Sequence, residues 1–181
     1  MNERFYSSDP DNIYRMAERC SSAADRLCRD NDFLGAIRVT EKVVDLLQTY
    51  RDVVKVYGPD KLDLDIEIAF HDAEINYFTS QFYLSDDRYV LGEREARLSL
   101  RKFKQLRSIY ISNEHIKNKM AMRIRRLDEL IDYAQTSRTD PTNTKGINLL
   151  NEMDIASLLG NEEKVERLVK LFEANSTDRK N

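Results

Sequence analysis

Apolar residues recur at intervals of three and four along most of the chain, as expected for one face of an α-helix. In the first such segment, about residues 12–30, the apolar positions are Ile13, Ala17, Cys20, Ala24 and Leu27. The same periodicity continues through four further segments, at about residues 33–57, 61–84, 88–111 and 114–137. The pattern therefore predicts five long helices in succession.

Capping and turn residues separate these helices. We expect Asp11 to cap the first helix, Gly58-Pro59 to end the second, and Ser112 or Asn113 to cap the fifth. The run TSRTDPTNTKG, residues 136–146, has no apolar side chain, which predicts a linker at residues 139–146. Two shorter helices follow at about 147–159 and 162–174, and we expect residues 175–181 to be disordered.

The segment 61–84 differs from the others because it is apolar on two sides. One stripe contains Ile66, Ala69, Phe70, Ala73 and Tyr77, and a second stripe, roughly opposite, contains Ile68, Ile75, Phe78 and Phe82. A helix that is buried on both sides lies in the centre of a bundle. Either neighbouring helices of the same chain cover both stripes, or the second stripe forms a groove for a partner's helix.

Composition supports long helices. The 181 residues include only 5 Gly and 3 Pro, too few for a many-turned β protein. We therefore predict an all-α fold: an antiparallel bundle of about five long helices within residues 1–138, the linker, and a C-terminal helical hairpin at 147–174. The hairpin could pack on its own bundle, form a homo-oligomer, or act as a detachable binding element.

Charge is unevenly distributed, although the net charge is only −3. Residues 58–93 carry nine acids and two bases, whereas residues 94–126 carry eleven bases and two acids. The bases form stripes on the fourth and fifth predicted helices: Arg94, Arg97, Arg101 and Lys104 on one, and Lys119, Arg123 and Arg126 on the other. One interpretation is that these stripes balance the acidic charge of segment 61–84 and remain exposed to solvent. The other is that they bind an acidic peptide, a phosphorylated segment, lipid head groups or nucleic acid. Nucleic acid is the weaker alternative, because no exposed aromatic residues alternate with the bases.

No motif for catalysis is present. His71 and His115 fall on the polar faces of their helices, without a second ligand at metal-binding spacing. The five glycines are isolated, so no phosphate-binding glycine loop can form. We expect a protein that is not an enzyme, with no catalytic residues, no metal site and no cofactor.

Cysteine spacing and hydropathy indicate the compartment. Cys20 and Cys28 are eight residues apart in one predicted helix, too far along its axis to form a disulfide. The chain has no 18-residue apolar stretch, and its first residues, MNERFYSSDPDN, do not resemble a signal peptide. We expect a cytoplasmic protein whose contact with any membrane is peripheral, with a nuclear location as the alternative.

One segment resembles a known family. Residues 15–47, RMAERCSSAADRLCRDNDFLGAIRVTEKVVDLL, combine an alanine-rich helix, a short polar turn, an aromatic residue and Ala-Ile. This order resembles the first helical hairpin of MIT (microtubule-interacting and transport) and tetratricopeptide-like domains. Residues 120–134, MAMRIRRLDELIDYA, are similar to the third helix of an MIT domain. The pattern does not recur 34 residues further on, as a tetratricopeptide array requires.

The resemblance implies a non-catalytic domain that binds short partner helices or extended peptides in grooves between its own helices. An MIT-like domain further implies a role in endosomal sorting or autophagy. Our leading hypothesis is an adaptor that binds a partner in a groove formed by Ile68, Ile75, Phe78 and Phe82, with the two basic stripes as its rim. The alternatives are nucleic-acid or anionic-membrane binding through those stripes, and a homo-oligomeric structural subunit held by residues 147–174.

Overall fold

The computed structural model describes residues 9–55, 59–109, 111–139 and 145–177. Within these ranges the chain forms helices and no strand, which confirms the predicted all-α fold. The helices are α1 (Pro10–Arg29), α2 (Phe33–Val54), α3 (Pro59–Ser85), α4 (Tyr89–Arg107), α5 (Glu114–Thr139), α6 (Lys145–Leu158) and α7 (Glu162–Thr177).

Side-chain caps fix several helix starts. Helix α1 begins at Pro10, and its cap is Asp9, which accepts a hydrogen bond from the Asp11 backbone N at 3.2 Å; the prediction that Asp11 caps this helix was wrong. Proline suits the first helical position because its missing N–H would have no partner there. Asp32 caps α2 by accepting from the Gly35 N at 2.9 Å. The predicted cap at Asn113 is confirmed, since its side chain accepts from the backbone N of His115 at 3.0 Å.

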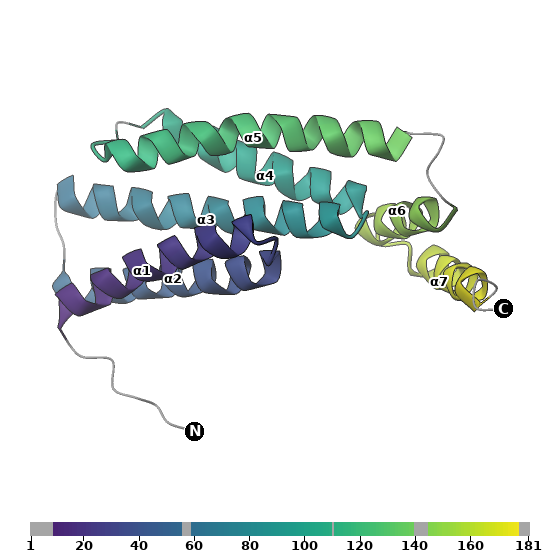
Figure 1. Cartoon of the computed structure of the whole chain (residues 1–181), viewed down its shortest axis with the longest axis horizontal. Coiled ribbons are helices and arrows are strands. Elements are labelled where there is room, and N and C mark those ends of the chain that lie inside the picture. The colour runs from purple at the N-terminus through teal and green to yellow at the C-terminus, as the bar shows by residue number, and fades with distance from the viewer. Residues whose placement is uncertain (1–8, 56–58, 110, 140–144, 178–181) are drawn as a thin grey trace, which may run out of the picture.

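Helix α3 lies between two helix pairs (Figure 1). The α1–α2 pair covers one side of it and the α4–α5 pair covers the other, and each helix from α1 to α4 packs along the next. The larger core lies mainly among α3, α4 and α5, where Phe70, Phe103 and Leu127 are fully buried. A smaller cluster, which includes Ile13, Leu47 and Leu64, joins α1 and α2 to the start of α3.

The second apolar stripe of α3 is largely covered by the chain itself. Phe78 has 0% of its surface exposed, so it belongs to the core and its assignment to a partner groove was wrong. Ile68 is half-buried against the cluster of α1 and α2. Ile75 and Phe82 are half-buried as well. Because α2 packs along α3, this face does not offer the open groove that its apolar spacing suggested.

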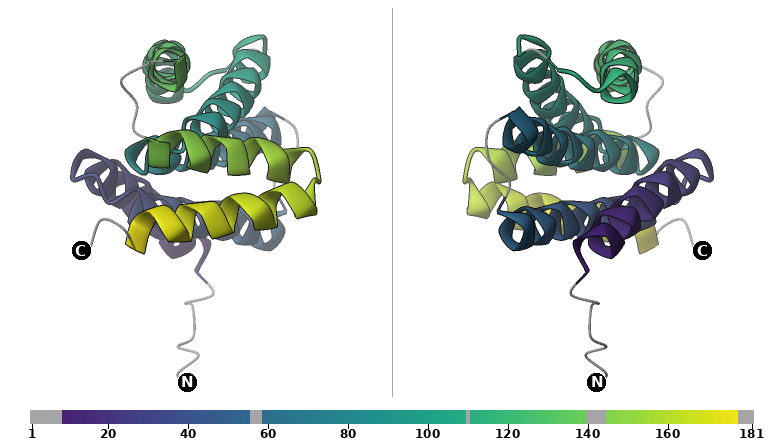
Figure 2. Two further views of the ribbon diagram at one scale, coloured as in Figure 1. Left: turned by 90° about the vertical axis from the view of Figure 1, so that its right-hand side faces the viewer. Right: turned by 90° about the vertical axis from the view of Figure 1, so that its left-hand side faces the viewer.

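The C-terminal hairpin packs on its own bundle. Figure 2 shows α6 and α7 crossing one end of the bundle. Arg88, just before α4, donates hydrogen bonds from Nε and Nη2 to the buried carboxylate of Asp154 in α6. Asn151 of α6 accepts a hydrogen bond from the Val90 backbone N at 3.1 Å. These polar contacts attach the hairpin at the turn between α3 and α4.

The ends of the hairpin differ slightly from the prediction. Lys145 and Gly146 belong to α6 rather than to the linker, and α7 continues past residue 174 to Thr177. Residues 140–144 of the predicted linker and residues 178–181 of the predicted tail lie outside the described residues.

The attachment of α6 can be tested at Asp154. We expect Asp154→Ala to speed amide hydrogen exchange in α6, because Arg88 loses a charge-assisted pair worth about 2 kcal/mol. The control is Glu152→Ala, which removes an exposed carboxylate from the same helix, 3.9 Å from its nearest cation. Equal exchange rates in the two variants would show that the Asp154 pair does not hold the hairpin.

Candidate interaction groove

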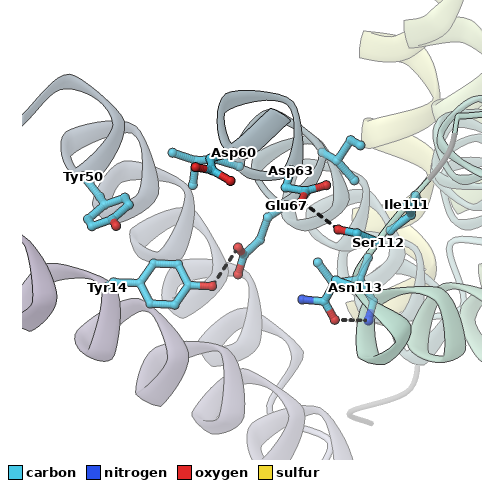
Figure 3. A pocket seen from close by; sticks show the side chains of 11 residues that line it. Tyr14, Tyr50, Asp60, Asp63, Glu67, Ile111, Ser112 and Asn113 are labelled. Carbon is cyan, nitrogen blue, oxygen red and sulfur yellow. Dashed lines mark hydrogen bonds between the residues drawn. The ribbon is translucent and has the colours of Figure 1, made fainter. Parts of the chain in front are cut away.

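Three adjoining hollows lie over α3, bordered by α1 on one side and α5 on the other. The first measures about 300 Å³ and lies where α3 and α5 begin (Figure 3). It shares Tyr14, Glu67, Asn113 and Ile116 with a second hollow of about 300 Å³. That one in turn shares Ser21, Ser22, His115 and Lys119 with a third, of about 740 Å³. We call the three hollows together the α1–α5 groove.

The groove follows α3 from Asp60 to Gln81. At about 1.5 Å per residue, this stretch of helix is about 30 Å long. The wall on α1 includes the small side chains of Ser21 and Ser22, and the wall on α5 includes Met122, which is 64% exposed. The groove is therefore long and open, with both polar and apolar groups along its sides.

A buried ion network crosses the floor of the groove. Glu74 of α3, whose side chain is 2% exposed, accepts hydrogen bonds from Arg123 Nε at 3.0 Å and Nη2 at 2.9 Å. Lys119 Nζ lies 3.3 Å from the same carboxylate. Asp25 of α1 pairs with both cations, at 3.0 Å from Lys119 and 2.7 Å from Arg123. The network thus links α1, α3 and α5.

Aromatic rings complete the surroundings of the two cations. The Arg123 guanidinium carbon lies 4.3 Å from the ring centroid of Tyr77 and 5.3 Å from that of Phe78. Lys119 Nζ lies 5.4 Å from the ring centroid of Phe70. These are cation–π distances, so each buried cation has both a carboxylate and an aromatic partner.

The partners of Glu74 keep its carboxyl group ionised. Burial by itself would raise the pKa of Glu74, because it disfavours the charged form. The hydrogen bond from His71 Nδ1, at 3.1 Å, and the charges of Lys119 and Arg123 outweigh burial and lower the pKa to about 2. At neutral pH, Glu74 is therefore a buried anion that holds two cations from α5.

The first hollow has a different character. Its side chains come from α1, α2, α3, the segment just before α5 and the first turn of α5 (Figure 3). The rings of Tyr14 and Tyr50 lie 5.3 Å apart between centroids. Tyr14 donates a hydrogen bond to Glu67 at 3.0 Å, and Ser112 donates one to Asp63 at 2.6 Å. Burial raises the pKa of Glu67, and burial together with the Glu67 charge raises the pKa of Tyr14.

The structure divides the predicted basic residues into two groups. Arg94, Arg97, Arg101 and Lys104 are exposed on the outer face of α4, where Arg97 pairs with Glu93 at 2.8 Å. Lys119 and Arg123 lie in the ion network instead, so they do not form an exposed rim. Arg126 is exposed and pairs with Glu129 at 2.7 Å. The two predicted stripes therefore do not form one continuous basic surface.

Sequence reasoning missed the acidic half of the network. His71 was expected on a solvated face, but it is 4% exposed and bonded to Glu74, so that prediction was wrong. A signal for Glu74 was present, because on a helical wheel it falls between the two apolar stripes of α3. Asp60, Asp63 and Glu67 share that face with it. A charge between two buried stripes needs a buried partner, and the bases of α5 supply it.

The chain matches no protein-family model, no curated protein and no solved structure. None of the described helices is both long enough and apolar enough to cross a membrane. In the part of the chain that the structure describes, no cluster of His, Cys, Asp and Glu is arranged to hold a metal ion.

The ion network predicts the effect of neutralising Glu74. Glu74→Gln should lower the free energy of unfolding by about 3 kcal/mol, because Lys119 and Arg123 stay buried with one carboxylate instead of two. Urea denaturation measures this change. The control, Glu41→Gln, makes the same change at an exposed position of α2 and should stay within about 0.5 kcal/mol of wild type. A similar small change for Glu74→Gln would mean that the network adds no stability.

The network also predicts a pH dependence. Since the pKa of Glu74 falls from 4.5 to about 2 on folding, the ionised group stabilises the fold above pH 4.5. That contribution, about 3 kcal/mol, is lost as the pH falls from about 5 to about 2. Urea denaturation at several pH values should show this loss in wild type and a shallower one in Glu74→Gln. Parallel profiles for the two proteins would contradict the assignment to Glu74.

Proposed function

We propose that this chain is a non-catalytic protein–protein interaction adaptor that binds one helix of a partner in the α1–α5 groove. The observation that carries the proposal is the groove itself, which runs about 30 Å along α3 and is bordered by two helices of the same chain. A helix of about 20 residues has this length. Binding of an amphipathic helix in a groove between helices is a common mode of peptide recognition.

The side chains of the groove support such an occupant. Ser21 and Ser22 leave space above α3, and the flexible side chain of Met122 can adapt to an apolar residue of the partner. Between them, the ion network of Asp25, Lys119 and Arg123 holds α1 and α5 in place. A partner helix would thus meet walls that are already positioned.

The resemblance of residues 15–47 to MIT and tetratricopeptide-like hairpins supports the same function. Those families bind helices or extended peptides in inter-helix grooves. The proposal that the adaptor acts in endosomal sorting or autophagy rests on this resemblance alone. The groove proposed here involves α1, α3 and α5, and not the apolar stripe at Ile68, Ile75, Phe78 and Phe82.

A peptide selection tests the proposal. From a display library of randomised 20-residue peptides, we expect the full chain to select peptides that become helical when bound. Ser22→Tyr places a large ring in the groove at an exposed position, and it should weaken their binding about tenfold or more. Gln48→Tyr introduces the same ring on the exposed face of α2, outside the groove, and serves as the control.

Two results would count against this function. One is a selection that yields no binding peptide. The other is a set of peptides that bind Ser22→Tyr and Gln48→Tyr equally well, which would place the binding surface elsewhere on the molecule. Circular dichroism shows whether a selected peptide becomes helical when it binds. It therefore distinguishes a helical occupant from an extended one.

A further inference from the structure

We infer that the first hollow of the groove binds a cationic side chain, arginine or lysine, presented by the partner helix. The inference rests on the proposed function and adds the chemistry of the partner to it. We call this hollow the acidic–aromatic pocket; its characteristic residues are Tyr14, Tyr50, Asp60, Asp63 and Glu67.

The carboxylates of this pocket have no ion-pair partner among the described residues. Across residues 9–55, 59–109, 111–139 and 145–177, no Lys, Arg or His nitrogen forms an ion pair with Asp60, Asp63 or Glu67. The most buried carboxylates elsewhere in these ranges are paired: Glu74 with Lys119 and Arg123, Glu93 with Arg97 and Arg138, and Asp154 with Arg88. In the acidic–aromatic pocket, Asp63 and Glu67 are half-buried and Asp60 is exposed, and none of the three has such a cation.

The start of α3 explains only part of this acidity. Acids in the first turn of a helix are stabilised by the helix dipole, which accounts for Asp60. Asp63 lies in the second turn and accepts a hydrogen bond from Ser112. Glu67 lies in the third turn, beyond that effect, and burial raises its pKa. In the described residues Glu67 accepts a hydrogen bond from the Tyr14 hydroxyl at 3.0 Å, and the charge of His71 lowers its pKa without offsetting burial. A neutral donor compensates a carboxylate less than a cation does, so Glu67 would gain most from a ligand charge.

The two tyrosine rings provide a second attraction for the same ligand. Tyr14 comes from α1 and Tyr50 from α2, and their rings are tilted by 52° to each other, with centroids 5.3 Å apart. The faces of such rings attract a cation within about 6 Å. These residues come from different helices (Figure 3), so rings and carboxylates line one space. With about 300 Å³, that space holds a side chain rather than a second helix.

The position of the pocket gives the partner helix a direction. It occupies one end of the groove, whereas Arg29 lines the hollow at the other end, where Lys119 and Arg123 are already paired with Asp25 and Glu74. A basic residue near one end of the bound helix would enter the acidic–aromatic pocket, and the same residue at the opposite end would meet Arg29 and no unpaired carboxylate of that hollow. Charge complementarity therefore favours one of the two orientations.

A small-molecule titration tests the pocket without a partner helix. We would add N-acetyl-arginine amide, and separately the uncharged N-acetyl-citrulline amide, to the full chain and follow the Tyr14 and Tyr50 ring resonances by NMR. The arginine compound should give saturable shifts at millimolar concentration, and the citrulline compound should not. Asp63→Asn with Glu67→Gln should weaken arginine binding about tenfold. The matched control, Asp128→Asn with Asp132→Asn, makes the same charge change on the exposed face of α5.

Selected peptides provide the second arm. Replacing their basic residue by norleucine should weaken binding to wild type about tenfold, and binding to Asp63→Asn/Glu67→Gln less than about twofold. Shifts with the arginine compound that persist in that double variant would overturn the inference, as would the absence of any shift.

The two proposals fail in different ways. Ser22→Tyr lies outside the acidic–aromatic pocket and should leave arginine binding intact while blocking peptides. Arginine binding with no peptide selected would keep the pocket and overturn the adaptor function. Peptide binding that depends on Ser22 but not on Asp63 and Glu67 would keep the adaptor and overturn the pocket.

Discussion

The buried carboxylate of Glu74 is the constraint on which the arrangement of helices depends. An anion at this depth is tolerated only with cations beside it, and both cations come from α5, with Asp25 of α1 completing the network. Helix α5 therefore cannot rotate or slide along α3 without leaving Glu74 as a buried charge that lacks its cations. Apolar packing holds the helices together, and this network determines their register around the groove.

The fold followed from the sequence because its signals are local. Spacings of three and four, the Asn113 cap and the scarcity of glycine and proline each depend on residues close together in the chain. Because α3 is apolar on two sides, its central position was also predicted correctly. Which helix covers which stripe was not predictable in this way, since Phe78 could face either a partner or α2 and its neighbours.

The candidate site was harder to predict because it depends on charges that are distant in sequence. Glu74 and Arg123 are 49 residues apart. The sequence showed only that residues 58–93 are rich in acids and residues 94–126 rich in bases, and not which of them form pairs. The spacing of Lys119 and Arg123 is typical of an exposed basic stripe, but both side chains are buried beside Glu74 and have a structural role. Net charge along a helix indicates where ion pairs are needed, but the pairing follows from the packing of helices.

The link between Asp25 and the two cations of α5 has a further consequence for molecular recognition. It sets the separation of α1 and α5 before any ligand arrives, so association would require little reorganisation of this chain. The loss of conformational entropy would then fall mainly on the other molecule, which suits a segment that is unstructured by itself and becomes helical on contact. Coupled folding of this kind gives specific but reversible association.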